Sequence, residues 1–141
     1  MNRIARTAVS LVAGCLIAVV IAQTGNMAAR IFWPDYAAAE PTKAYSLAML
    51  VARLAVGALC TAAAGCVTTI MARDGRAAWL LGGIFLAISL PIHLFRVWAD
   101  YPAWYHIVYL GYLVPIAGLA GLAMQRLSLR QVRPLKPSIE H

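Results

Sequence analysis

Charged residues are scarce in this chain of 141 residues. They make up 12% of the sequence, while hydrophobic residues make up 62%. A soluble domain has about a quarter of its residues charged and roughly half apolar, which is enough polar surface to be wetted. The shortage of charge therefore excludes an ordinary soluble domain and predicts that much of the surface faces lipid. The length fits a single domain.

Acidic residues and catalytic motifs are also missing. Only 5 Asp and Glu stand against 12 Lys and Arg, and none lies deep in an apolar run, which argues against a proton-driven exporter of the small four-helix type. The chain has no nucleotide-binding loop, no H-E-x-x-H and no G-x-S-x-G, and its three cysteines form no C-x-x-C. No basic stripe interleaves with aromatics outside the apolar runs, so nucleic acid is not an expected partner. We expect no cofactor and no metal, and enzymes are the less favoured class.

What the sequence does contain is long apolar runs separated by short polar ones. The fold class that this pattern predicts is an all-α, integral membrane four-helix bundle, since about 20 apolar residues suffice to span a bilayer as a helix. The expected spans are at about 7–23, 45–71, 77–97 and 104–124, within one domain covering 1–141. Residues 24–43 are expected to form an outer connection at the headgroup level, and residues 125–141 a basic tail.

The first apolar run admits a second interpretation, as a secretory signal. Residues 12–15 read Val-Ala-Gly-Cys, which resembles a lipoprotein cleavage box. The chain stays apolar directly after this box, where a mature lipoprotein would turn polar. We therefore interpret the run as a retained transmembrane helix.

The distribution of cations predicts the orientation. With the N-terminus in the cytoplasm, eight cations fall on the cytoplasmic side, against three outside and Arg53 within a span. Cytoplasmic loops of membrane proteins are enriched in Lys and Arg, so this orientation agrees with the rule and the reverse violates it. We expect a multi-pass protein of a bacterial-type inner (plasma) membrane with both termini cytoplasmic. The cytoplasmic cations are Arg3, Arg6, Arg73, Arg76, Arg126, Arg130, Arg133 and Lys136, and the outer ones are Arg30, Lys43 and Arg96.

Small residues recur at helical spacing in two of the spans. Small side chains let helix backbones approach closely in lipid, within one chain or between chains. The leading functional hypothesis is therefore a non-enzymatic structural or accessory subunit, which packs against itself or a larger membrane complex and otherwise contacts membrane lipids. The helix-packing residues are Gly57, Thr61 and Gly65 in the second span and Gly118 and Gly121 in the fourth.

A polar and aromatic patch in the outer half of the bundle supports two other hypotheses. Ser89, His93, Arg96 and Asp100 share one helical face, and Tyr105, Tyr109 and Tyr112 form a stripe on the next span. Ionisable groups at membrane depth are costly and mark candidate sites. The first is a binding or transport protein, in which the patch forms a pocket for a lipid head group, an anionic ligand or a quinone-like ligand. The ligand-binding candidates are Arg53, Ser89, His93, Arg96, Asp100, Tyr109 and Tyr112.

The structural alternative is that Arg53 reaches up to the head groups or pairs with Asp100 or Glu40 to hold the helices together. A membrane enzyme that uses His93 as acid or base is the third hypothesis. A haem held by His93 and His106 is disfavoured, because the sequence places the two histidines at different depths.

Overall fold

The structure is a computed structural model that describes residues 2–131. Of the described residues, 88% are in helices and none is in a strand, so the prediction of an all-α fold is confirmed. Four long helices are joined by short connections, one of which contains the short helix α2 and another the 3₁₀ turn η1. The elements are α1 (Arg3–Phe32), α2 (Pro34–Ala39), α3 (Leu47–Ala72), α4 (Arg76–Phe95), η1 (Trp98–Asp100) and α5 (Ala103–Gln131).

All four long helices are long and apolar enough to cross a membrane. Their outward faces are apolar along most of their length; Leu16 on α1 is 61% exposed and Ile107 on α5 is 68% exposed. A soluble protein rarely exposes so much contiguous apolar surface. These features suggest a multi-pass membrane protein.

Helix boundaries follow local signals more closely than hydropathy. The Asn2 side chain accepts a hydrogen bond from the backbone N–H of Ala5 (2.8 Å) at the start of α1, and Ser46 caps α3 in the same way by accepting from the N–H of Met49 (3.4 Å). Arg73 ends α3 in the left-handed conformation, with φ of 57°. Such caps satisfy the free backbone groups at helix ends.

Two boundaries differ from the sequence prediction. The first helix was expected to end at residue 23, but α1 continues to Phe32. Residues 24–30 include the polar Thr24, Asn26 and Arg30 but no proline, so no backbone N–H is removed before Pro34 opens α2. The tail expected from residue 125 is helical as far as Gln131, and its remaining residues lie outside the described part of the chain.

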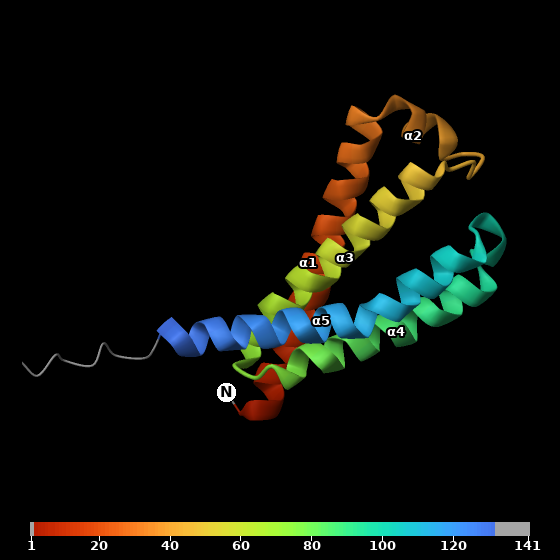
Figure 1. The fold of residues 1–141 in the computed structure, drawn as a ribbon. Coiled ribbons are helices and arrows are strands. Elements are labelled where there is room, and N and C mark those ends of the chain that lie inside the picture. Colours follow the sequence, from red (N-terminus) through yellow and green to blue (C-terminus); the bar gives the residue numbers. More distant parts are fainter. Residues whose placement is uncertain (1, 132–141) are drawn as a thin grey trace, which may run out of the picture.

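The helices form two hairpins that cross and then diverge (Figure 1). One hairpin contains α1, α2 and α3, and the other contains α4, η1 and α5. We call the end that carries α2 and η1 the open end, because the two hairpins point apart there. The closed end carries the start of α1, the turn at 73–75 and the last turns of α5.

Glycines allow close helix contacts both at the crossing of the two hairpins and within the hairpin of α4 and α5. A Cβ added to Gly65 of α3 would meet the backbone of Ala117 on α5, 3.1 Å from its Cα. A Cβ on Gly82 of α4 would lie 2.8 Å from the Cα of Val114 on α5, and Gly121 faces Ala78 and Thr69. Gly118 is covered by the indole of Trp79. Most of the small-residue positions predicted for packing are therefore used inside the monomer.

Candidate functional site

The most concentrated polar feature at the open end is Arg53, which is enclosed by tyrosine rings. Its guanidinium carbon lies 5.9 Å from the ring centre of Tyr36, 5.0 Å from that of Tyr45 and 5.6 Å from that of Tyr101. Its Nη1 donates hydrogen bonds to the hydroxyls of Tyr36 (2.5 Å) and Tyr45 (3.4 Å). These distances are those of cation–π contacts, which strengthen when the cation is withdrawn from water.

The charge of Arg53 has no acidic partner among the described residues. The two ion pairs there are Arg3–Asp74 (2.9 Å) and Arg30–Glu40 (2.6 Å). The pairing of Arg53 with Glu40 or Asp100 that the sequence allowed is therefore absent, because Arg30 on the extended α1 takes Glu40. The Arg53 Nε is buried and has no hydrogen-bond partner.

The phenols around Arg53 do not neutralise it. Burial raises the pKa of Tyr45 and Tyr101, although the nearby Arg53 works against that shift. Both rings therefore stay neutral over the ordinary pH range. The Arg30 guanidinium holds the pKa of Glu40 below its usual value, so that carboxylate remains ionised and committed to Arg30. Arg53 therefore keeps its positive charge without an ion-pair partner among the described residues.

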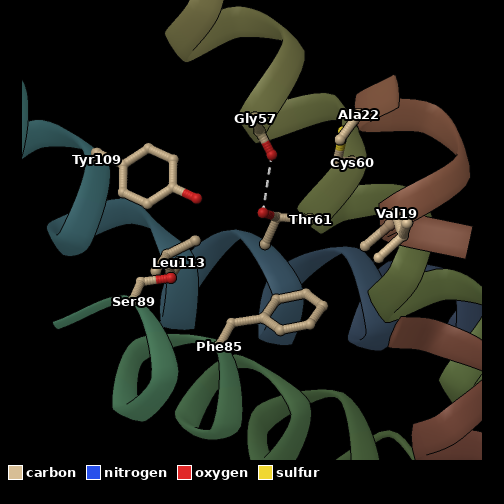
Figure 2. Close-up of a pocket in the computed structure, with 10 residues that line it drawn as sticks. Val19, Ala22, Gly57, Cys60, Thr61, Phe85, Ser89, Tyr109 and Leu113 are labelled. Carbon is tan, nitrogen blue, oxygen red and sulfur yellow. Dashed lines mark hydrogen bonds between the residues drawn. The ribbon is translucent and has the colours of Figure 1, made fainter. Parts of the chain in front are cut away.

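Two adjoining cavities lie beside this cluster, between α1 and the inner faces of α3, α4 and α5. The first has a volume of about 200 Å³ and is mainly apolar, with wall residues that include Val19, Phe85 and Leu113. Figure 2 shows Tyr109 and Ser89 of one hairpin facing Gly57, Cys60 and Thr61 of the other across this cavity. The Thr61 hydroxyl is already committed, since it donates to the carbonyl of Gly57 (2.8 Å).

The second cavity is the polar neighbour of the first. It has a volume of about 150 Å³ and shares Ala22, Gly57, Cys60 and Tyr109 with the first. Its other wall residues are Asn26, Arg53, Val56 and Tyr105. The two spaces together therefore offer an apolar compartment beside a positively charged one.

A pair of histidines packs against Tyr109, which is a residue of the cavity wall. Nδ1 of His93 on α4 lies 2.8 Å from Nδ1 of His106 on α5, and Nε2 of His106 lies 3.3 Å from the carbonyl oxygen of Trp98. A carbonyl can only accept, so in the neutral pair His106 carries its hydrogen on Nε2 and its Nδ1 accepts from His93. The ring of His93 stacks on Tyr109 at 4.5 Å between centroids, which links the pair to the cavity.

This geometry disagrees with a haem between the two histidines, because the facing nitrogens are already within hydrogen-bond distance of each other. The described residues also contain no group of three or more His, Cys, Asp or Glu that could hold a metal ion. The pair is suited instead to sharing a proton and to fixing the position of Tyr109.

The residues predicted from sequence are only partly brought together. Arg53, Ser89 and Tyr109 line the cavities. Tyr112 lies beside them but donates its hydroxyl to the carbonyl of Leu54 (3.2 Å), which is a structural contact. Arg96 is exposed at the end of α4 and Asp100 belongs to η1, and neither lines these cavities.

Sequence reasoning missed several residues of the site. Tyr36 and Asn26 were assigned to the outer connection, where they could not be placed against a helix. The continuation of α1 puts Asn26 one turn beyond Ala22, and Tyr36 on α2 is only 1% exposed. The signal that could have found Asn26 is the absence of a helix breaker between Gln23 and Pro34.

Comparison with known proteins adds no assignment to this geometry. No family model, no curated protein and no solved structure matches the chain.

Proposed function

We propose that this protein binds a membrane amphiphile with an anionic head, held at the open end between the two hairpins. The observation that carries the proposal is Arg53, a half-buried guanidinium that lines a cavity, has neutral partners and leaves Nε without one. A cation withdrawn from water is costly unless an opposite charge or further hydrogen bonds compensate it. An anionic head group in the second cavity supplies that compensation.

The shape of the site favours an amphiphile over a small polar anion. The apolar compartment adjoins the charged one directly, through the shared wall that includes Gly57 and Tyr109. The two volumes together fall near the lower end of the range of about 300–1,000 Å³ for small-molecule sites. The head therefore contacts Arg53 while the start of an apolar chain occupies the space beside Phe85.

The small-residue faces pack inside this chain, which argues against ranking the accessory-subunit hypothesis first. Gly65 and Gly121 contact residues of this same chain, so those positions no longer point to an external protein partner. The binding hypothesis keeps its support, since Arg53 and the cavities are not consumed by internal ion pairs.

The orientation is part of the proposal. Six of the cations in the described residues lie at or near the closed end, namely Arg3, Arg6, Arg73, Arg76, Arg126 and Arg130. In a bacterial-type inner membrane, this charge would place the closed end and both termini in the cytoplasm and the cavities in the outer half. Reporter fusions at the chain end and in the connection between α4 and α5 test this arrangement.

The test compares two arginine variants of the open end. Arg53→Leu removes the enclosed cation, while Arg96→Leu removes an exposed one that lines neither cavity. After gentle extraction from the native membrane, native mass spectrometry should show a bound anionic amphiphile in the wild type and in Arg96→Leu. In Arg53→Leu, bound ligand should fall by about tenfold or more, since a charged hydrogen bond lost at a site is worth roughly 1.5–3 kcal/mol.

Equal retention of the bound ligand by both variants would contradict the proposal. A bound neutral quinone that Arg53→Leu still retains would also contradict it. Circular dichroism and size exclusion establish that each variant is folded. If Arg53→Leu does not fold, Arg53→Lys is the replacement, because an ammonium keeps the charge but not the planar fork. It should bind the same ligand more weakly than the wild type.

A further inference from the structure

Three buried polar atoms lack a hydrogen-bond partner among the described residues, and all three belong to residues that line hollows. They are Nε of Arg53, Nε of Arg6 and the hydroxyl oxygen of Thr69. The first belongs to the site described above. Arg6 and Thr69 lie near the closed end instead, on α1 and α3. Orphaned buried polar atoms are uncommon in proteins, so two more at one end need a partner.

Two hollows at the closed end share the side chain of Arg73. The first, of about 360 Å³, lies between α1 and α3 and is lined by Arg6, Val9, Met71 and Arg73. The second, of about 350 Å³, lies between α3 and α5 and is lined by Thr69, Ile70, Arg73, Gln125, Ser128 and Leu129. Each hollow is therefore lined by one residue with an unpartnered polar atom, Arg6 in the first and Thr69 in the second, and Arg73 lines both.

The backbone conformation of Arg73 is unusual for an arginine. It caps α3 with φ of 57°, and its N–H donates to the carbonyl of Thr69 (2.8 Å). Glycine is the usual residue in a left-handed cap, because it has no Cβ to strain. Arginine at such a position contributes a charged side chain that glycine would not.

No carboxylate competes for these two arginines among the described residues. Asp74 is the nearest acid in the sequence, but it accepts from the side chain of Arg3 (2.9 Å) and from the backbone N–H of Arg76 (3.0 Å). The two hollows are therefore positively charged on their polar side. Their remaining walls include exposed apolar side chains, among them Val9, Ile70 and Leu129.

We propose that the closed end holds one anionic phospholipid, with its phosphate between Arg6 and Arg73. Guanidinium groups bind phosphate oxygens with paired hydrogen bonds, which suits two arginines facing one group. The acyl chains run along the apolar walls of the two hollows, beside Val9 and Met71 and beside Ile70 and Leu129. The Thr69 hydroxyl, which has no partner among the described residues, donates to an ester oxygen. Free phosphate would leave the apolar walls uncovered, which favours the lipid.

The experiment titrates delipidated full-length protein in detergent and reads bound lipid by native mass spectrometry. The probes are phosphatidylglycerol, phosphatidylcholine and inorganic phosphate. The wild type should bind phosphatidylglycerol about tenfold more tightly than phosphatidylcholine, and the double variant Arg6→Gln/Arg73→Gln should lose about that factor, which corresponds to roughly 1.4 kcal/mol. The control Arg126→Gln/Arg130→Gln has the same net charge and changes exposed arginines that line neither hollow.

An equal loss in the two double variants would mean general charge attraction and would overturn the proposal. Displacement of phosphatidylglycerol by an equal concentration of inorganic phosphate would also overturn it, because the apolar walls would then contribute nothing. The titration is repeated in an Arg53→Leu background, which removes the anionic contact at the open end. Phosphatidylglycerol binding that remains there and is lost with Arg6→Gln/Arg73→Gln belongs to the closed end, so failure of this site and failure of the open-end site are distinguishable.

A second pair of variants keeps the proposal testable if the arginine variant does not fold. Leu129→Asp adds a carboxylate to the wall of the second hollow, and Leu127→Asp adds one to a neighbouring position outside it. Leu129 is 67% exposed and Leu127 is 53% exposed, so neither change reaches the core. Only Leu129→Asp should weaken phosphatidylglycerol. Equal effects of the two would contradict the site.

Discussion

The two ends of this bundle are built from side chains of opposite size. Toward the closed end, α3 and α5 meet through Gly65, Ala117 and Gly121, so the backbones are nearly in contact. At the open end, the hairpins diverge (Figure 1) and large rings join them, with Tyr45 of one hairpin stacked on Tyr101 of the other at 5.9 Å between centroids. The sequences of α3 and α5 both change from large residues near the open end to small residues toward the closed end.

The difference separates a part that fixes the fold from a part that can hold a ligand. Glycine contacts between backbones leave little room to adjust, since protein interiors are close-packed. The large rings and the arginine at the open end leave spaces between the helices, which are the two cavities beside Tyr109. The comparison predicts that changes at the crossing destabilise the protein, while changes at the open end alter contacts and binding.

The largest effect is expected from Gly65→Leu. Its side chain would have to occupy the position of the Ala117 backbone, which cannot move without displacing α5. Overpacking in a core costs about 1–3 kcal/mol or more, so we expect a strong loss of thermal stability in detergent. The control is Gly83→Leu, because no neighbouring atom of the described chain lies within 4 Å of a Cβ added at Gly83. Similar thermal unfolding of the two variants would show that the crossing does not depend on glycine.

A smaller effect is expected from His106→Phe at the open end. The new ring keeps the stack on Trp98, which lies 4.7 Å from the His106 ring, but cannot accept from His93. A polar group left without its partner costs about 1–3 kcal/mol. The matched change is His93→Phe, which leaves Nδ1 of the fully buried His106 without its donor. It should cost more than His106→Phe, which frees groups of the half-exposed His93 and of Trp98, which is 47% exposed. Chemical unfolding that ranks the two in the reverse order would contradict this account of the pair.

Gly57 lies between the two ends of the bundle, and a double-mutant cycle can test its contact with Tyr112. A Cβ there would press against the hydroxyl of Tyr112, which is held by its bond to Leu54. Gly57→Ala should therefore lower the free energy of unfolding by about 1 kcal/mol in the wild-type background. The loss should be much smaller in a Tyr112→Phe background. Residues in direct contact show coupling of about 0.5–3 kcal/mol in such a cycle. Additive effects would mean that the two residues do not contact each other as described.

The smallest effect is expected at the closed-end turn. The backbone N–H of Arg76, and then the side chain of Arg3, hold the pKa of Asp74 below its ordinary value. A lowered pKa in the folded state stabilises the protein above the unfolded pKa of about 4 and ceases to do so as pH falls through the folded value. Asp74→Asn should lower the unfolding temperature slightly at pH 5–7, and the difference should vanish in stronger acid. A difference in unfolding temperature that grew as the pH fell would contradict a stabilising role of the Asp74 carboxylate.

The helical content and the number of long helices could be predicted, because apolar runs of span length are unambiguous. The end of α1 could not be taken from hydropathy, since polar residues from Thr24 onward continue a helix as readily as apolar ones. The partners of Arg53 were missed for a related reason. Periodicity shows which residues share a face of one helix, but the rotation of α3 against α2 and η1 decides which tyrosines reach it.

The histidine pair illustrates the same limit. The sequence placed His93 deeper than His106, yet the two rings meet, because the three-residue helix η1 lets the start of α5 return beside the end of α4. Ser89 and Tyr109 were correctly grouped as residues of one patch, and both line the first cavity. Arg96 was grouped on the helical face of Ser89, but it follows Phe95, the last residue of α4, and lines neither cavity.

The unequal lengths of the helices have a consequence for the surrounding bilayer. α1 has 30 residues and α4 has 20, which correspond to about 45 Å and 30 Å of rise. The hydrocarbon layer is about 30 Å thick, so α4 would match it nearly upright while α1 would need a steep tilt. The divergence of the hairpins in Figure 1 provides that difference in inclination. A protein of this form would occupy more cross-sectional area in one leaflet than in the other, and would therefore favour membranes whose curvature accommodates a wedge.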